Sequence, residues 1–259
     1  MSVFYFLLSG AVVERVIPSP EEEVLPGVVW GGPETVFTPC YWMTQYWMRE
    51  EALPPHQRIG ESFEEEVVAC LLGGYGIPAE VGIAAFNRLR DRSLISTLCS
   101  NSVELAEALH APLTVCGRQV KYRFWLQKAQ YVAAALDIIS KAPPPTDSSD
   151  SLRAYLLKIP GIGPKTASWI VRNWLASNDV AILDIHVVRA GMLMGLYSES
   201  DKVTEHYFRM ERRFLSFASA INVPAARLDA LIWAQMRNAP LRVTRDASRA
   251  GTAAQVATA

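Results

Sequence analysis

One stretch of the sequence, LKIPGIGPKTASWIVRNWLASNDVAILDIH, holds the residue types and spacing that point most directly to chemistry. Gly161 and Gly163 stand at a bend between two helix-like runs, Lys165 follows the bend, and Asp184 and His186 lie downstream. Glycines at a bend allow positive φ or close approach of the backbone to an outside group. A helix that begins just after the bend, with proline in its first turn, presents free N–H groups to an anion. A DNA phosphate is the natural anion here, and such a hairpin would hold the DNA backbone and not read its base sequence.

The segment 157–167, L-x-I-P-G-I-G-P-K-T-A, resembles the helix-hairpin-helix of base-excision DNA glycosylases. In the lysine-bearing members of that superfamily an aspartate lies just before a histidine in a V-D-x-H turn, and residues 183–186, L-D-I-H, are similar. Asp184 comes 19 positions after Lys165, which matches the 8-oxoguanine DNA glycosylase/AP lyase branch. Residues 69–83 resemble the DNA-wedge helix pair of that branch, and residues 123–132 resemble its R-A-x-Y-V helix. The resemblance covers roughly residues 60–240.

The resemblance implies that Lys165 is a nucleophile and Asp184 its electrostatic partner. A neutral lysine amine can attack the sugar of an extruded nucleotide and form a Schiff base, and an ionised carboxylate can stabilise the positive charge that develops on the sugar. Each residue also has a structural interpretation. Lys165 could contact only phosphate, as in a non-catalytic helix-hairpin-helix module, and Asp184 could be the N-cap of the helix that follows, a role compatible with catalysis. His186 is expected to contact phosphate or to make a structural hydrogen bond.

Residues of an expected base pocket and DNA wedge also come from the resemblance. Trp233-Ala234-Gln235 looks like the W-A-Q motif whose glutamine reads the extruded base, although Gln235 could equally be a helix-packing residue. Trp169 lies four residues after Lys165, on the same helical face, and is either a pocket wall or a core residue. Tyr75, in the Gly73–Gly76 turn, occupies the position of the residue that fills the gap left in the duplex; the alternative is a tyrosine that packs on the turn.

The elements that must position these residues are mainly helices. Residues 2–17 favour one or two strands, and Thr38-Pro39 is typical of a capped helix start, followed by aromatic residues expected to be core. Ser62 and Glu65 resemble a capping box. The sequence predicts helices throughout 79–139, Ser151 as the cap of the helix leading into the hairpin, and Pro224 at the start of a last helix over 225–238.

Composition is compatible with this interpretation and adds limits. The chain has 259 residues, 50% of them apolar, and a net charge of −1, so attraction to DNA must come from a local surface. The four cysteines are dispersed without a C-x-x-C pair, and none follows Cys116, so no iron–sulfur cluster is expected; a structural monovalent cation at the hairpin is compatible with the resemblance. We find no signal peptide or membrane-length apolar run, and therefore expect a cytoplasmic protein that acts as a monomer on double-stranded DNA carrying a damaged base.

The expected fold is mainly α, a two-lobed helix-hairpin-helix glycosylase fold with a short β-containing N-terminal segment. In it the first and last helices form one lobe, the middle helices and hairpin form the other, and the base enters the cleft between them. Along the chain we expect an N-terminal extension over 1–58 that packs on the helical body, a glycosylase body over 59–245 with the hairpin at 152–175, and a flexible tail over 246–259. The favoured function is excision of an oxidised purine, with 8-oxoguanine the favoured base, through a lysine Schiff base followed by β-elimination. One alternative is that the same chemistry acts on another damaged or hypermodified base. The other is that the chain is a non-catalytic helix-hairpin-helix DNA-binding protein.

Overall fold

The protein is mainly α-helical, as the sequence predicts. The structure, a computed structural model, describes residues 2–52, 58–74 and 76–240, and these contain ten helices and three two-stranded antiparallel sheets. The described parts of Met1–Pro55 and Asn178–Ala259 form one compact unit, unit 1, and those of His56–Ser177 form a second, unit 2. The first and last helices therefore belong to one lobe and the middle helices to the other, which confirms the two-lobed fold. The expected tail over 246–259 lies outside the described residues.

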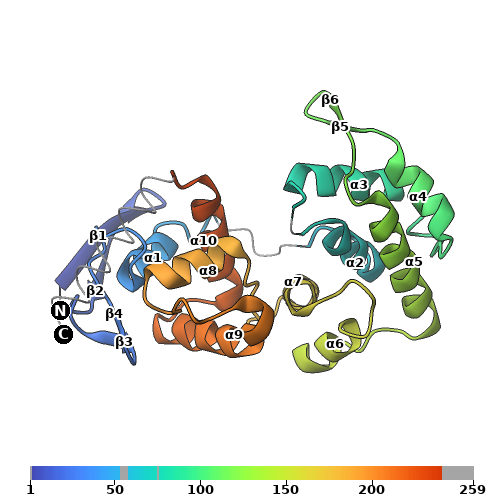
Figure 1. Cartoon of the computed structure of the whole chain (residues 1–259). Helices are drawn as coiled ribbons and strands as arrows, with labels where there is room; N and C mark the ends of the chain where they lie inside the picture. Colours follow the sequence, from blue (N-terminus) through green and yellow to red (C-terminus); the bar gives the residue numbers. More distant parts are fainter. Residues whose placement is uncertain (1, 53–57, 75, 241–259) are drawn as a thin grey trace. The chain divides into compact units, whose positions relative to one another are not determined.

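In its described part, unit 1 contains two β-hairpins and helices that share one core. Its elements are β1 (Ser2–Leu8), β2 (Ala11–Ile17), β3 (Glu23–Leu25), β4 (Val28–Val29), α1 (Pro39–Trp47), α8 (Ile185–Leu193), α9 (Val203–Ala220) and α10 (Ala225–Asn238). Figure 1 shows α10 within this unit, where it packs on both α1 and α8. Apolar side chains from both ends of the sequence, including Phe6, Trp42, Phe214 and Ile232, form a single buried cluster. The N-terminal segment is thus part of the core that α8–α10 complete.

Local signals explain where the helices of unit 1 begin. Thr38 accepts a hydrogen bond from Tyr41 N through its side-chain Oγ1, 3.1 Å apart, and Pro39 occupies the first turn of α1, as predicted. The last helix begins after Pro224, also as predicted. In the described part of the chain no single helix is long and apolar enough to cross a membrane; α9 and α10 meet the length and composition criteria only as a pair bent by 101°.

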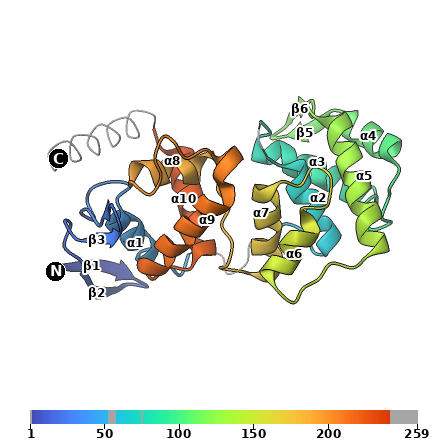
Figure 2. The ribbon, with the colours of Figure 1, turned by 60° about the horizontal axis from the view of Figure 1, so that its bottom comes forward.

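Unit 2 contains the hairpin and the helices that support it. Its elements are α2 (Phe63–Leu72), α3 (Ala79–Asp91), α4 (Ser102–His110), β5 (Leu113–Val115), β6 (Arg118–Val120), α5 (Trp125–Lys141), α6 (Ser149–Leu156) and α7 (Pro164–Leu175). Figure 2 shows α7 next to α2 and α6, the two helices on which it packs. The helix that carries Lys165 is therefore held between two neighbours in the same unit.

Two predictions for unit 2 are wrong in detail. Residues 79–139 are not helical throughout, because β5 and β6 pair around Cys116 and Gly117, whose φ angles are +47° and +76°. Two consecutive residues with positive φ make the tight turn that matches the twist of a two-stranded hairpin. The cap of α6 is Ser148 and not Ser151: Ser148 Oγ accepts from Ser151 N at 3.1 Å. An N-cap side chain accepts from a backbone N–H two or three residues later, and in a stretch with several serines the sequence alone does not select which one is the cap.

Candidate active site

The hairpin between α6 and α7 contains two glycines that have different physical reasons to be glycine. Gly161 has φ +84°, and a Cβ at this position would lie 2.3 Å from Cδ2 of Tyr131 on α5. Gly163 has φ −94°, and a Cβ there would meet nothing within 4 Å. Ile159 and Ile162 are buried and anchor the bend in the core. Gly161 thus lets the hairpin lie against α5, whereas the backbone at Gly163 is open to an approaching group.

Helix α7 begins at this open glycine. Gly163 is the N-cap and supplies no side-chain cap, and Pro164 occupies the first turn. The first N–H groups of a helix have no partner within the helix, and together with the helix dipole they favour an anion. Lys165, partly exposed, stands in the same first turn. This arrangement suits the binding of a phosphate, because it combines a lysine, a helix N-terminus without a side-chain cap, and an open glycine.

Trp169 lies one turn after Lys165 and packs on the end of α2. A Cβ at Gly73 would come 3.2 Å from Cη2 of the Trp169 ring, so the absence of a side chain at Gly73 allows this contact. The structure therefore brings Lys165 and Trp169 together on α7, as the spacing predicts. Tyr75, the predicted DNA wedge, lies outside the described residues.

Lys128 is a residue near this site that the sequence analysis did not single out. Its Nζ donates hydrogen bonds to the carbonyl oxygens of Leu71 and Gly73 at the C-terminal end of α2. Burial lowers the pKa of Lys128, and the positive charge of Lys165 lowers it further. Lys128 thus fixes the α2 end on which Trp169 rests, and its charge acts on the predicted nucleophile. The only sequence signal is its place in the KAQYV segment that resembles the R-A-x-Y-V helix.

A buried polar network fixes α7 against α2. Glu66 is fully buried; its Oε2 accepts from the backbone N–H groups of Ile59 and Gly60 at 2.7 and 2.9 Å, and its Oε1 accepts from Asn173 Nδ2 at 2.6 Å. Asn173 Oδ1 in turn accepts from the Arg172 side chain at 2.9 and 3.1 Å. Buried polar groups that are satisfied in this way specify a single packing arrangement. The orientation of the helix that carries Lys165 is therefore defined from inside unit 2.

In unit 1, Asp184 is the N-cap of α8. Its Oδ1 accepts hydrogen bonds from the backbone N–H groups of His186 and Val187, both at 2.9 Å, which confirms the capping role. Its Oδ2 accepts no hydrogen bond from the described residues. A carboxylate held by one oxygen in this way keeps a fixed direction while its second oxygen stays available for a substrate.

The segment before Asp184 is held by side chains from α9 and α10. Glu211 Oε1 accepts from Ala181 N at 3.1 Å, and Asp229 Oδ2 accepts from Ile182 N at 3.0 Å. Tyr207 Oη donates to Ala181 O at 2.8 Å. Glu211, Asp229 and Tyr207 are all at most 5% exposed. An extended segment that is not part of a sheet must find other partners for its backbone groups, and these buried side chains supply them.

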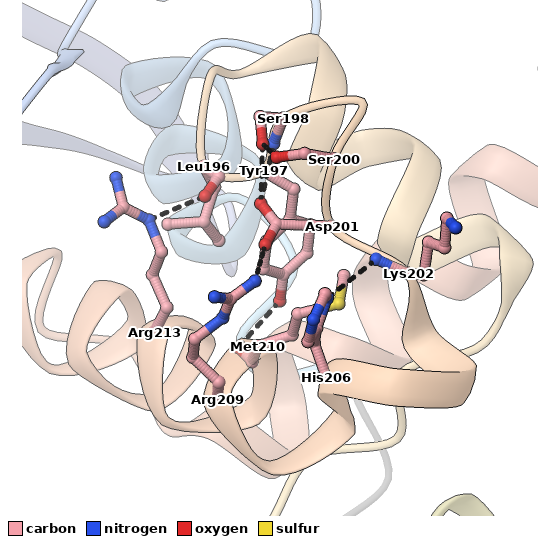
Figure 3. A network of polar contacts seen from close by, with 10 residues as sticks. All are labelled: Leu196, Tyr197, Ser198, Ser200, Asp201, Lys202, His206, Arg209, Met210 and Arg213. Atoms are coloured by element: carbon pink, nitrogen blue, oxygen red, sulfur yellow. Dashed lines mark hydrogen bonds and ion pairs between the residues drawn. The ribbon is translucent and has the colours of Figure 1, made fainter.

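A polar network lies at the start of α9, the helix that carries Tyr207 and Glu211. Figure 3 shows Asp201 between Ser198 and Arg209: its Oδ2 accepts from Ser198 N at 2.9 Å, and its Oδ1 is paired with Arg209 at 2.6 Å. These contacts, the backbone hydrogen bond from Ser198 foremost, lower the pKa of Asp201. Tyr197, also drawn there, donates to Met210 O at 3.1 Å. The network fixes the first turns of the helix that presents Tyr207 and Glu211.

His186, the predicted phosphate contact, lies in the first turn of α8. Its Nδ1 is buried and has no hydrogen-bond partner among the described residues. A neutral imidazole has one donor and one acceptor nitrogen. In the tautomer with the proton on Nε2, His186 presents an N–H donor on its other edge, from which a phosphate oxygen could accept a hydrogen bond.

The predicted base-reading residues stand on α10 in different surroundings. Trp233 is 38% exposed, and the guanidinium of Arg237 lies 5.1 Å from its ring centroid. Gln235 is half-buried and is hydrogen-bonded to α1: Tyr41 Oη donates to its Oε1 at 2.7 Å, and its Nε2 donates to Gln45 Oε1 at 3.0 Å. The predicted site residues are divided between the two units. Unit 1 contains Asp184, His186, Trp233 and Gln235, and unit 2 contains Gly161, Gly163, Lys165 and Trp169. In the part of the chain that the structure describes, no group of three or more His, Cys, Asp or Glu side chains could hold a metal ion.

The family model and the curated relatives agree on one family. The model of the 8-oxoguanine DNA glycosylase family with a helix-hairpin-helix matches residues 54–223. Among curated proteins, the chain is 34% identical over 118 residues to an 8-oxoguanine DNA glycosylase/AP lyase of Metallosphaera sedula, a match that covers 43% of this chain and 57% of that protein. The chain thus spans less than two thirds of that relative's length.

Two solved structures are similar as well. The 8-oxoguanine DNA glycosylase of Thermotoga maritima shares 25% identity with a TM-score of 0.55, over 74% of this chain and 94% of that one. The 8-oxoguanine DNA glycosylase of Methanocaldococcus jannaschii shares 25% identity with a TM-score of 0.51, over 68% of this chain and 78% of that one. The match to the family model includes both the hairpin and the Asp184 turn.

Proposed function

The chain belongs to the 8-oxoguanine DNA glycosylase family, and from this premise we propose that it is a bifunctional DNA glycosylase and AP lyase that excises 8-oxoguanine from double-stranded DNA. The observation that carries the proposal is the first turn of α7, where Lys165 follows the open backbone at Gly163 in a chain of this family. The relatives named 8-oxoguanine DNA glycosylase/AP lyase support both activities.

In the proposed reaction the damaged nucleotide leaves the base stack, because its sugar cannot be reached inside the duplex. The neutral amine of Lys165 attacks C1′ as the glycosidic bond breaks and the base departs with the bonding electrons. Positive charge develops on the sugar, and the carboxylate of Asp184 stabilises it. The ring then opens to give a protonated imine between Nζ and C1′. Loss of a proton from C2′ breaks the C3′–O bond and releases the 3′ phosphate, and water finally hydrolyses the imine.

The remaining predicted site residues bind the DNA in this proposal. The N–H groups at the start of α7 donate hydrogen bonds to one phosphate, which approaches the open backbone at Gly163; Gly161 lets the hairpin lie against Tyr131. His186 donates from Nε2 to a second phosphate. A net charge of −1 does not attract DNA as a whole, so these few directed contacts must fix its position.

Borohydride trapping tests the proposal, because reduction of the imine leaves a covalent protein–DNA adduct. The duplexes contain 8-oxoguanine, an abasic site or undamaged guanine, and the proteins are wild type, Lys165→Gln, Asp184→Asn and the control Lys158→Gln. Lys158 is an exposed lysine that precedes the same hairpin. We expect wild type and Lys158→Gln to be trapped on the 8-oxoguanine and abasic duplexes, and Lys165→Gln on neither.

The other outcomes are equally informative. Adducts on abasic DNA alone would support the AP lyase activity and show that the excised base is not 8-oxoguanine. Trapping that survives in Lys165→Gln would remove Lys165 from the role of nucleophile. Retained DNA binding with no wild-type adduct on any duplex would refute the Schiff-base reaction and leave a DNA-binding protein.

A further inference from the structure

The side chain of Gln235 takes part in a hydrogen-bonded chain that has a single direction. Tyr41, Gln45 and Arg49 follow one another at intervals of four residues along α1 and the turn after it. Arg49 donates to Gln45 Oε1, Gln235 Nε2 donates to the same oxygen at 3.0 Å, and Tyr41 Oη donates to Gln235 Oε1 at 2.7 Å. All four residues belong to unit 1.

Arg49 fixes the direction of this chain. A guanidinium has donors and no acceptor, so Gln45 must turn its amide oxygen toward Arg49. The second lone pair of that oxygen can accept only from the nitrogen of Gln235, and this leaves the Gln235 oxygen on the Tyr41 side. Tyr41 is held in turn by its ring, which packs edge-on against the fully buried Trp42 with the centroids 5.1 Å apart.

The amide of Gln235 is therefore engaged but not saturated. A glutamine amide has two N–H donors and two oxygen lone pairs, and α1 uses one of each. One donor and one acceptor remain, and the side chain is only half-buried, so a ligand can reach them. An unrestrained amide can exchange the positions of its nitrogen and oxygen by rotating 180°, whereas in this one the rotation would lose the hydrogen bond from Gln235 Nε2 to Gln45 and set two amide oxygens against each other.

A fixed amide can distinguish two kinds of purine. On the Watson–Crick edge of a guanine-type base the group at C6 is an acceptor and N1–H is a donor, whereas an adenine-type base presents these functions in the opposite order. A freely rotating amide could pair with both edges. A fixed amide pairs with one and leaves unpaired groups against the other, which is a strong basis for rejection.

We propose that Gln45 and Arg49 lock the amide of Gln235 in one orientation, with Tyr41 as its second hydrogen-bond partner, and thereby select a purine with a keto group at C6 over one with an amino group. This rests on the proposed function and on the predicted role of Gln235 in reading the excised base. Tyr41, Gln45 and Arg49 are positioning residues: they act through Gln235. They and Gln235 all lie outside residues 54–223 that match the family model, so this specificity device belongs to segments that the family model does not cover.

The test compares single-turnover excision of 8-oxoguanine and 8-oxoadenine from otherwise identical duplexes. Gln45→Leu removes the lock. Gln45→Glu keeps it, because a carboxylate still accepts from both Arg49 and Gln235, and Tyr41→Phe keeps it, because a tyrosine hydroxyl can pair with either end of an amide and so does not set its orientation. The matched control on the same helix is Tyr46→Phe, whose hydroxyl donates to Glu50 in the turn after α1 and does not contact Gln235. Borohydride trapping on an abasic duplex gives the active fraction of each protein. The excision rates are corrected by this fraction, so that a loss of folded protein is not mistaken for a loss of selectivity.

We expect the preference for 8-oxoguanine over 8-oxoadenine to fall at least ~10-fold in Gln45→Leu, and to be retained in Gln45→Glu, Tyr41→Phe and Tyr46→Phe. An unchanged preference in Gln45→Leu would overturn the proposal, and so would an equal loss in Gln45→Leu and Gln45→Glu. A wild type that forms adducts on abasic DNA but shows no preference between the two bases would overturn the lock and leave the lyase intact. A wild type that forms no adduct at all would overturn the proposed function, and the lock with it.

Discussion

The two hairpin glycines give a prediction that separates folding from DNA binding. Replacing Gly161 with alanine puts a side chain in the left-handed region, at φ +84°, and places its Cβ 2.3 Å from the Tyr131 ring. The backbone conformation costs about 1–2 kcal/mol, and moving the ring aside costs about 1–3 kcal/mol, so we expect a loss of about 2–5 kcal/mol in the free energy of unfolding. Gly163→Ala meets neither obstacle, because φ is −94° and no atom lies within 4 Å.

The same pair should behave in the opposite way toward DNA. A methyl group at Gly163 would stand where the proposed phosphate approaches, so Gly163→Ala should weaken binding to an abasic duplex while its free energy of unfolding changes by less than about 1 kcal/mol. Urea denaturation and fluorescence anisotropy measure the two quantities. In Tyr131→Ala the clash is absent, so the added cost of Gly161→Ala should shrink to the backbone term of about 1–2 kcal/mol. Equal stability losses in the two glycine variants, or a Gly161→Ala cost that Tyr131→Ala leaves unchanged, would refute this account of the hairpin.

Three further predictions concern the carboxylates. Glu66→Ala leaves three buried donors without an acceptor and should lower the free energy of unfolding by at least about 3 kcal/mol in urea denaturation, whereas Glu64→Ala on the same helix should change it by less than about 1 kcal/mol. Asp229→Ala releases the segment before Asp184 and should slow single-turnover excision about 10–100-fold, an effect that should be absent when Asp184 is already asparagine. The pKa of Asp201 is lowered in the folded protein, so its ionised carboxylate stabilises the fold at pH values above 3.8, the ordinary pKa of aspartate. This stabilisation is lost as the pH falls through the folded-state pKa. Asp201→Asn should therefore lower Tm at pH 6, and the difference from wild type should shrink as the pH falls below 3.8; it should be at most about 1 kcal/mol because Arg209 is largely exposed.

Local sequence features predicted the parts of the site that depend on neighbours in the chain. The two glycines and the proline before Lys165 require a hairpin followed by a helix start, and Asp184 before an apolar helical run requires an N-cap; both are confirmed. The aromatic residues expected in the core are also confirmed for Trp42 and Trp47. In each case the interaction responsible joins residues that are close in sequence, so the local sequence pattern is enough to predict it.

Contacts between distant segments could not be predicted in this way. The reason that position 161 must be glycine includes a ring on α5, and Gln235 meets Tyr41 across 194 positions of sequence. Tyr41 was expected to be a core residue like its neighbours, yet its hydroxyl group reaches another helix. The β5–β6 hairpin was missed because its turn, Cys116-Gly117, follows strands of only three residues, too short to show a period of two.

The order in which the two units can complete their folding during synthesis follows from the division of unit 1 into two separate stretches of sequence. Unit 2 is one continuous stretch and can fold as soon as it is synthesised, whereas unit 1 begins with β1 and α1 and is completed only by α8–α10. Trp42 and Phe6 must therefore wait for Phe214 and Ile232 while all of unit 2 is translated, a delay on the order of ten seconds. During that interval the nascent chain exposes strands and large aromatic side chains, and it needs protection from aggregation more than the finished protein does.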